Sequence, residues 1–410
     1  GWGARVFIVD DPNIRTELNI SPVDAIDPWK IKLAIKDLDE ALARKGEMIA
    51  ALLIVGGADV VPFHKLPNPT DDTDADVPSD NPYATLDSNY FVPEWPVGRL
   101  PGEAGQDAAL LLAQIHRLTT YHNQNRRLTT APSLVEIFFR LLDLFRKKAS
   151  KTKKKTRKGS SGNFGITAAV WRKASTNVFS PIGGSGDLIM TPPDQSGTYP
   201  YQRITSASLA YCNLHGVTDA PDWYGQRDSQ ESPAGPDYPI ALSPQDLPAS
   251  GQSPLVVFSE ACYGAYIFNK KEDESMALKF MGIGTQVMVG STTVAYGSVD
   301  APLIGADLLA NLFWKNLKAG STAGEAFMRA KIELAREMNS RQGFLDGEDQ
   351  KTLLSFVFFG DPLTSVADNK KLRKSYRPMQ QLTVKTVCDH KSDEMESAPL
   401  ADYVLKEVKD

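Results

Sequence analysis

The sequence predicts an α/β fold with a mainly parallel sheet that is flanked by helices. The chain has 410 residues, of which 42% are hydrophobic, so it can bury a large core in one domain or two. Short apolar runs that end in glycine or a polar residue recur along the chain, as in buried parallel strands. Segments with apolar residues at helical spacing separate several of these runs, and such alternation places helices on both faces of a parallel sheet.

The first predicted elements form a strand–helix–strand unit. Residues 5–10 and 51–57 are apolar runs that end in turn residues, and both are expected to be strands. Residues 28–45 carry apolar side chains at helical spacing and are expected to form the helix between them. Two more helices are expected at residues 104–122 and 133–148.

Further strands are predicted in the second half of the chain. They are apolar runs at residues 165–171, 209–213, 255–259, 285–291 and 355–359. Beyond residue 366 the composition becomes charged and poor in apolar side chains. We therefore expect residues 367–410 to be a linker with a peripheral piece.

The composition excludes several classes of protein. The net charge of −5 comes from 45 basic and 50 acidic residues, too small an imbalance to predict binding to nucleic acid or to an anionic membrane. No apolar run approaches the roughly 20 residues of a membrane span. Cys212, Cys262 and Cys388 show no CxxC or Cys/His spacing, so neither a disulfide framework nor a zinc site is expected. The chain begins at Gly1 without a leader pattern, so we expect a processed or excised piece.

Two polar insertions interrupt the pattern. Residues 146–158 hold nine basic residues among thirteen and continue into a glycine–serine segment, so we expect 146–162 to be a solvated loop or a self-processing or partner-contact segment. Residues 67–82 contain five aspartates and resemble a calcium loop, but Val77 and Tyr83 replace the glycine and glutamate of an EF-hand. Structural calcium is therefore kept as an alternative, and no other metal or cofactor is expected.

The strongest chemical signal is a histidine and a cysteine that follow two predicted strands. His215 directly precedes Gly216, and Cys262 lies two residues before Gly264. A parallel sheet presents such side chains at its carboxyl edge. Their separation of 47 residues is close to the roughly 50 residues between the histidine and cysteine of caspases. The pattern predicts a cysteine peptidase.

These residues suggest definite roles. An imidazolium or a helix N-terminus would lower the pKa of Cys262 and raise its thiolate fraction. The backbone N–H groups of Gly216 and Cys262 would bind the oxyanion, and His215 would protonate the leaving amine. Each residue alone has a structural alternative, because an isolated cysteine is more often a buried hydrophobe and an isolated histidine a core residue. Their joint placement at strand ends beside glycine favours catalysis.

Several motifs together resemble the gingipain family of cysteine peptidases, within the larger group that includes caspases and legumains. The resemblance extends from about residue 50 to residue 366, and the motifs occur in the same order. They are LIVGG at 53–57 with Val61 and Pro62, DNPY at 80–83, VGRLP at 97–101, NLHG at 213–216, EACxG at 260–264, the strand at 284–292 with Tyr296, and FGDP at 359–362.

The resemblance implies a caspase-like architecture of two subdomains. Residues 1–125 would form the smaller N-terminal α/β subdomain, and residues 126–366 would form the catalytic one. Cys262 and His215 would be the catalytic residues, and protein or peptide would be cleaved through a thioester without a metal or redox cofactor. The same analogy favours secretion over a cytoplasmic location, and it leaves the oligomeric state open.

The resemblance breaks down in the pocket for P1, the substrate residue before the scissile bond. Gingipains hold a basic P1 side chain with an acid after the first strand of the catalytic subdomain, and the matching residues 168–175 contain none. Another loop could supply the carboxylate, which would make the basic loop a self-cleavage site. Alternatively, Arg172 or Lys173 could select an acidic P1, or Trp171 and Tyr296 could line an apolar slot. The candidate carboxylates are Asp222, Glu260 and Asp300.

Functions of other classes stay open at this point. A catalytically inactive caspase-like module would keep the strand-end pair and use the fold for binding or signalling. An α/β-hydrolase-like or nucleotide-binding enzyme is disfavoured, because the sequence has no GxSxG elbow, no Walker A motif and no GxGxxG after a strand.

Overall fold

An eight-stranded sheet forms the centre of the fold. The computed structural model describes residues 3–12, 19–105, 107–129, 162–198, 202–231, 234–248 and 253–366. The strand order of the sheet is β1-β4-β12-β11-β10-β7-β5-β6. Its neighbouring strands are parallel except for β11 and β12, which are antiparallel. The predicted α/β fold with a mainly parallel sheet is confirmed.

The strands are short. Those of the large sheet are β1 (Leu52–Val55), β4 (Val97–Leu100), β5 (Phe164–Ala168), β6 (Leu188–Thr191), β7 (Leu209–Asn213), β10 (Val256–Ser259), β11 (Val287–Ser291) and β12 (Phe356–Gly360). Two small antiparallel pairs lie outside it, β2 (His64–Leu66) with β3 (Val77–Ser79) and β8 (Trp223–Tyr224) with β9 (Ile240–Leu242). The helices are α2 (Pro28–Ala43), α3 (Ala109–Thr129), α5 (Arg172–Phe179), α6 (Gln202–Thr205), α7 (Met276–Ile283), α8 (Gly305–Ala319), α9 (Ala323–Gln342) and α10 (Gly347–Ser355).

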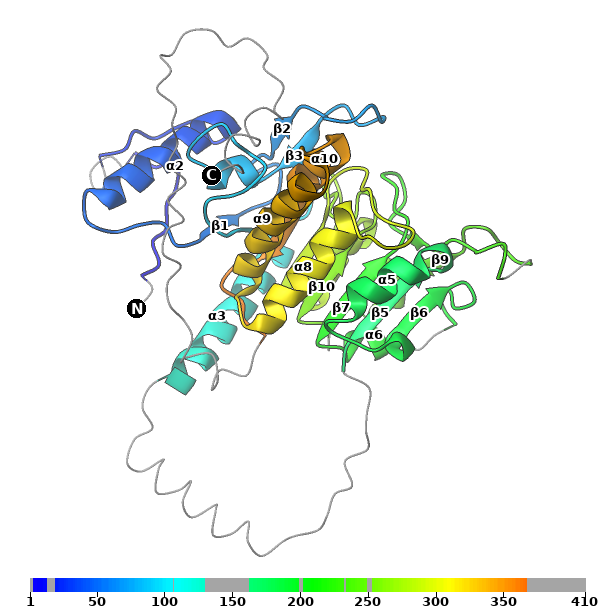
Figure 1. The fold of residues 1–410 in the computed structure, drawn as a ribbon. Coiled ribbons are helices and arrows are strands. Elements are labelled where there is room, and N and C mark those ends of the chain that lie inside the picture. The colour runs from blue at the N-terminus through cyan, green and yellow to red at the C-terminus, as the bar shows by residue number, and fades with distance from the viewer. Residues whose placement is uncertain are drawn as a thin grey trace, which may run out of the picture.

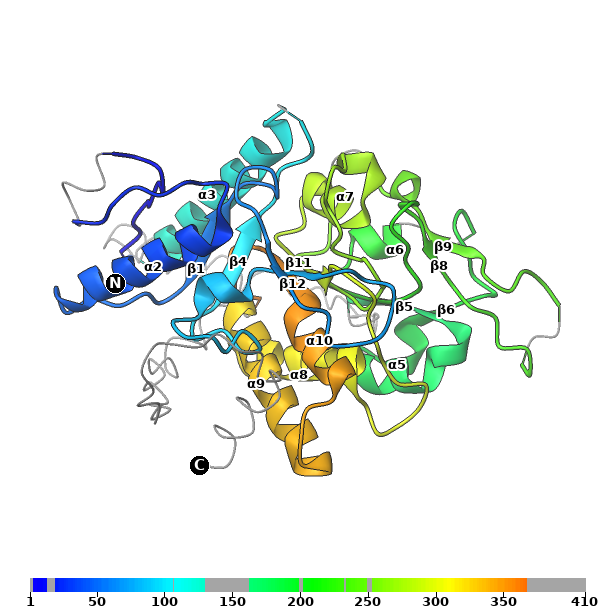
Figure 2. The same cartoon turned by 90° about the horizontal axis from the view of Figure 1, so that it is seen from above.

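Helices cover both faces of the sheet (Figures 1 and 2). Helices α3, α6 and α7 lie on one face, and α5, α8, α9 and α10 lie on the other. Successive strand residues point to opposite faces, so Phe258 and Phe358 join the core cluster beneath α8 and α9, whereas Val257 and Phe359 join the cluster beneath α7. Because both faces are buried, the strands read as continuous apolar runs rather than as alternating patterns.

Local signals in the sequence fix several helix ends. The Asp27 carboxylate accepts backbone N–H groups at the start of α2, where Pro28 occupies the first turn. Helix α9 ends at Gly343, whose φ of 86° suits glycine. Helix α10 begins after Asp346, whose carboxylate caps its first turn.

Most of the predicted elements are present with shifted ends. The predicted helix at 28–45 is α2, and the predicted strands at 51–57, 209–213, 255–259, 285–291 and 355–359 are β1, β7, β10, β11 and β12. Helix α3 begins five residues later than predicted, and the last part of the predicted strand 165–171 is a 3-10 helix, Ala169–Trp171. The predicted helix 133–148, the basic loop 146–158 and the tail 367–410 lie outside the described residues, apart from Gly162 at the end of the loop.

The predicted strand at residues 5–10 is wrong. No strand forms there, and Val6 is 89% exposed. Strand β1 is the terminal strand of the described sheet and pairs only with β4, and the apolar run at 5–10 does not add to its open edge. Strand β4 also pairs with β12, so the sheet continues from the N-terminal segment into the rest of the chain. The boundary between subdomains at residue 125 stays a prediction.

Within the described residues, none of the helices is both long enough and apolar enough to span a membrane.

Candidate active site

The structure places His215 and Cys262 at the same edge of the sheet. Their strands, β7 and β10, are parallel neighbours in which Cys212 is in register with Ser259. His215 and Cys262 each lie three residues beyond this register pair. The ladder continues through the N–H of Glu260, which donates to the carbonyl of Cys212 at 2.8 Å. Because both residues have the same offset from one register pair, their loops leave the sheet side by side.

Backbone contact brings these two loops together. A Cβ atom added to Gly216 would lie 2.2 Å from the carbonyl oxygen of Cys262. Only a residue without a side chain permits such a close approach. The glycine after His215 is therefore required by the packing of the His215 loop on the Cys262 loop.

The imidazole of His215 is half-buried and held on several sides. Its Nε2 atom lies 2.9 Å from Oε1 of Gln226, and its ring centroid lies 4.4 Å from that of Trp171 and 5.5 Å from that of Tyr238. Backbone hydrogen bonds at 2.8 and 2.9 Å also join His215 to Tyr224 in β8. With the Gln226 amide oxygen accepting the Nε2 proton, Nδ1 is the nitrogen left to accept a proton.

The thiol of Cys262 contacts the segment that follows β11. The backbone N–H of Ala295 donates to Sγ at 3.3 Å, and the thiol lies 3.6 Å from the carbonyl oxygen of Ala295. Burial raises the pKa of Cys262, and the N–H of Ala295 opposes that shift. No hydrogen bond among the described residues joins the thiol to the imidazole of His215.

The predicted lowering of the Cys262 pKa is wrong. Burial raises the pKa of this thiol and lowers the pKa of His215, because a low-dielectric environment disfavours both charged forms. The resting site therefore holds a neutral thiol and a neutral imidazole. Both side chains could be predicted from the sequence, but the burial that shifts their pKa values could not.

Two backbone donors border the Cys262 loop. In the part of the chain that the structure describes, neither the N–H of Gly216 nor that of Cys262 donates to an acceptor on another residue. The N–H of Cys262 acts on its own sulfur, where it opposes the rise of the thiol pKa, whereas the N–H of Gly216 has no acceptor among the described residues and is available to a ligand. These are the two donors that the sequence predicts for an oxyanion.

Glu260, one of the predicted pocket carboxylates, is buried against a second acid. Asp307, in the first turn of α8, interacts with it directly and accepts the N–H of Ser298 at 2.5 Å. Burial raises the pKa of Glu260 far above its usual range and that of Asp307 to about 6. At neutral pH the pair therefore holds one proton and one negative charge. Gln226 and Asp307 could not be predicted from the sequence as parts of the site, because neither belongs to a motif.

The other charged candidates have partners at the surface. Lys173 pairs with Asp300 at 3.2 Å, and Arg172 pairs with Glu231 at 3.0 Å. Both pairs are exposed, and surface pairs of this kind contribute little to stability. Asp222, just before β8, is partly exposed. Within the described residues, no hydrogen bond or ion pair connects Asp222 or Asp300 to His215 or Cys262.

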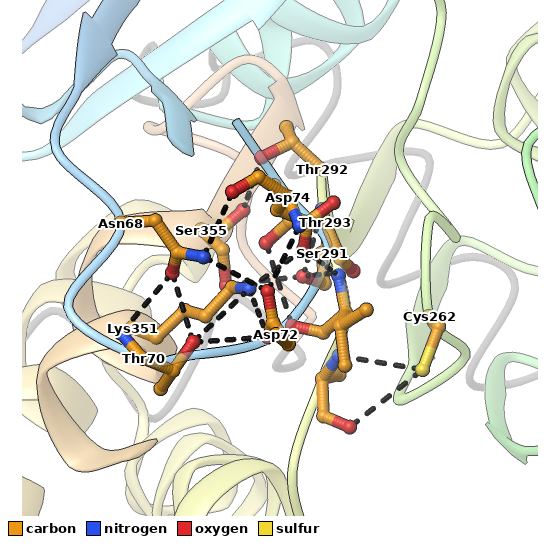
Figure 3. Close-up of polar contacts among 12 residues, drawn as sticks. Asn68, Thr70, Asp72, Asp74, Cys262, Ser291, Thr292, Thr293, Lys351 and Ser355 are labelled. Atoms are coloured by element: carbon orange, nitrogen blue, oxygen red, sulfur yellow. Dashed lines mark hydrogen bonds and ion pairs between the residues drawn. The ribbon is translucent and has the colours of Figure 1, made fainter. Parts of the chain in front are cut away.

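Two aspartates of the loop that resembles a calcium loop contact an ammonium group. Lys351 of α10 is fully buried, and its Nζ atom contacts the carboxylates of Asp72 and Asp74, the latter at 2.6 Å (Figure 3). Tyr296, predicted to line the P1 pocket, donates its hydroxyl to Asp72 at 2.6 Å. Among the described residues there is no group of three or more His, Cys, Asp or Glu side chains that could hold a metal ion.

Several solved structures of proteases have a similar fold. Gingipain R, an Arg-specific cysteine proteinase, aligns with a TM-score of 0.54 at 17% identity, over 84% of this chain and 69% of its own. The complex of the pro- and mature domains of RgpB from Porphyromonas gingivalis gives 0.51 at 18% identity, over 82% and 70%. A further protease structure gives 0.53 at 14% identity, over 85% and 70%. At these identities the likeness establishes the fold, which is the gingipain-like fold predicted from the sequence.

A family model adds the classification. It describes peptidase family C25 and matches residues 3–133 and 243–367, more than half of the chain. The matched residues include Cys262, whereas His215 lies in the unmatched part between them. A comparison with curated protein sequences gives no match. The chain belongs to peptidase family C25, the gingipain family, and is a cysteine-type peptidase.

Proposed function

We propose that the chain is an endopeptidase in which His215 and Cys262 form the catalytic dyad. The observation that carries this proposal is the shared position of the two residues, each three residues beyond one register pair of neighbouring parallel strands. The contact between Gly216 and the Cys262 carbonyl supports it, because that contact holds the two loops together. An endopeptidase of this kind acts on protein or peptide substrates.

The proposed reaction begins from the neutral pair. Nδ1 of His215 takes the thiol proton as Sγ of Cys262 attacks the scissile carbonyl carbon, and the carbonyl electrons move onto oxygen. Collapse of this intermediate breaks the C–N bond, the amine leaves with the proton from His215, and a thioester remains. Water, deprotonated by His215, then attacks the thioester carbon, and the thiolate leaves and regains a proton.

Gln226 and the backbone N–H groups of Gly216 and Cys262 have supporting roles in this proposal. The hydrogen bond from Nε2 to Gln226 orients the imidazole and raises the pKa of His215 against the effect of burial. The N–H groups of Gly216 and Cys262 would stabilise the oxyanion, for which removal of one donor typically costs about 100-fold to 1000-fold in rate.

We further propose that P1 is Lys or Arg. The support is the carboxyl pair of Glu260 and Asp307, which carries one negative charge two residues before the nucleophile. Arg172 and Lys173 already have acidic partners, which argues against an acidic P1. This preference would make the basic loop 146–158 a substrate for self-processing, although that loop lies outside the described residues.

The test is peptide cleavage by matched variants. Cys262→Ala and His215→Ala are each expected to lower kcat/KM by at least about 1000-fold. The nucleophile and its base act as one unit, so removal of either one abolishes nearly all of the rate enhancement that the two give together. Cys212→Ala is the control, because Cys212 is a fully buried residue of β7. Cleavage by the wild type at neutral P1 residues as fast as at Lys or Arg would refute the P1 assignment. No cleavage of any peptide by the wild type would favour a binding module.

A further inference from the structure

Residues 293–296 lie between the Cys262 thiol and a partly buried cluster of charges (Figure 3). On the thiol side, this segment runs along the nucleophile loop. The N–H of Tyr263 donates to the carbonyl of Thr293 at 2.9 Å, and the N–H of Ala295 donates to Sγ of Cys262 at 3.3 Å. The segment therefore covers the proposed nucleophile with its backbone.

The cluster on the other side, here called the Lys351 cluster, consists of Asp72, Asp74 and Lys351. The acids come from the loop between β2 and β3, and the lysine comes from α10. Both acids contact the buried ammonium group. Hydrogen bonds from Lys351 and Tyr296 outweigh burial and hold the pKa of Asp72 well below its usual range, so this carboxylate is charged at neutral pH.

The carboxylates of the cluster are also bonded to the segment and to the nucleophile loop. The Tyr296 hydroxyl donates to Asp72 at 2.6 Å, and the N–H of Val294 donates to Asp74 at 3.0 Å. The hydroxyl of Tyr263, the residue after the nucleophile, donates to Asp74 at 2.8 Å. The two acids thus connect the ammonium group of Lys351 both to the segment 293–296 and to the loop that carries the nucleophile.

A second buried lysine provides a comparison within the same molecule. Lys331 is also fully buried, and its Nζ atom donates to the side-chain oxygen of Asn81 at 2.8 Å and to the carbonyl of Phe356 at 2.9 Å. Its hydrogen-bond acceptors are neutral, and none of them lies in the segment 293–296. Burying a lysine in this fold therefore does not in itself require two carboxylates that also bind the nucleophile region.

We propose that Asp72, Asp74 and Lys351 are positioning residues that hold the segment 293–296 across the thiol of Cys262. The cluster keeps the thiol buried in the resting protein. It also fixes the backbone edge beside which a peptide must lie to reach the sulfur. This inference rests on the proposed role of Cys262 as nucleophile.

The mildest test removes one hydroxyl. In Tyr296→Phe, the bond to Asp72 is lost and all charges are kept. We expect iodoacetamide to alkylate Cys262 about tenfold faster. Loss of one hydrogen bond to a charged group destabilises the closed position of the segment by an amount that corresponds to about this factor. We expect kcat/KM for peptides to fall by about the same factor, because the segment no longer holds its position. Alkylation is followed by mass spectrometry of the peptide that contains Cys262.

The pH profile of alkylation separates positioning from a general loss of structure. The titratable groups that act on the thiol are Asp74, Lys351 and Tyr263, and Asp72 contacts Lys351. Tyr296→Phe retains all four. Because burial is the main cause of the raised Cys262 pKa, partial opening of the segment moves the midpoint of the profile to lower pH. An unchanged midpoint together with unchanged rates would overturn the proposal.

Lys351→Met tests the ion pairs, and Lys331→Met is its matched control. We expect only Lys351→Met to accelerate alkylation of Cys262 and to slow cleavage. Cys212 reports whether the fold is intact, because it is fully buried and should stay unlabelled. If both lysine variants behave alike while Cys212 stays protected, the positioning role is refuted. Retention of cleavage in Cys262→Ala would instead refute the proposed nucleophile. The alkylation rates would still show whether the Lys351 cluster holds the segment over the thiol.

Discussion

Burial sets the protonation of the side chains in the site. It keeps Cys262 as a thiol and His215 as a neutral imidazole, and it forces Glu260 and Asp307 to share a proton. In the proposed mechanism, the first pair starts neutral and transfers a proton from sulfur to nitrogen. The second pair carries a single negative charge whose presence depends on pH.

The charge of the Glu260 and Asp307 pair gives the P1 proposal a pH signature. The pKa of Asp307 is about 6, so the pair is charged above that pH and becomes neutral below it. We expect the ratio of kcat/KM for an Arg P1 substrate to that for a Gln P1 substrate to fall about tenfold as the pH drops from 7.5 to 5. In Asp307→Asn the ratio should be low and independent of pH. A wild-type ratio that is constant over this range would contradict the assignment.

The ends of β7 and β10 were the most predictable part of the site. Apolar runs stop at Asn213 and Ser259, and His215 and Cys262 follow at a spacing that the sequence displays directly. The segment 293–296 and Gln226 were not predicted as parts of the site, because their roles depend on contacts between distant segments. The contact of the acidic loop with Lys351 could not be predicted, because Lys351 lies more than 270 residues further along the chain.

The contact between the two strand-end loops is tested by Gly216→Ala. The added Cβ would meet the Cys262 carbonyl at 2.2 Å, so one of the loops must shift. Because a displacement of about 1 Å costs about 100-fold in rate, we expect kcat/KM to fall by at least that factor. Thermal unfolding is expected to show a loss of about 1–3 kcal/mol. Gly186→Ala is the control, because a Cβ added there would have no neighbouring atom within 4 Å, and it should leave both quantities unchanged.

Across the whole molecule, the fold was predicted better than the packing around it. The alternation of apolar runs and helices was sufficient for the mainly parallel sheet, because burial on both faces imposes that pattern. The strand at residues 5–10 was wrong because an apolar run does not reveal whether a neighbouring strand exists to pair with it. Likewise, the burial of Lys331 and Lys351 could not be predicted from the sequence, since it depends on tertiary contacts.

Lys331 gives the folded chain a dependence of stability on pH. Burial lowers its pKa from 10.5 to about 7, so between these values the unfolded chain binds more protons than the folded chain. The Lys331 contribution to the free energy of unfolding therefore rises with pH from about 7 to 10, by at most about 1.4 kcal/mol per unit. We expect Lys331→Met to lack this increase in denaturant unfolding between pH 7 and 9. Parallel curves for the wild type and the variant would contradict the shift.

The most direct test of the proposed mechanism is the mass of the protein after reaction with a peptidyl chloromethyl ketone that has Lys at P1. We expect one adduct per chain, located on Cys262, and we expect the adduct to form at least about 100-fold more slowly in His215→Ala. An adduct on Cys212 or Cys388, or no adduct while peptide cleavage continues, would contradict it.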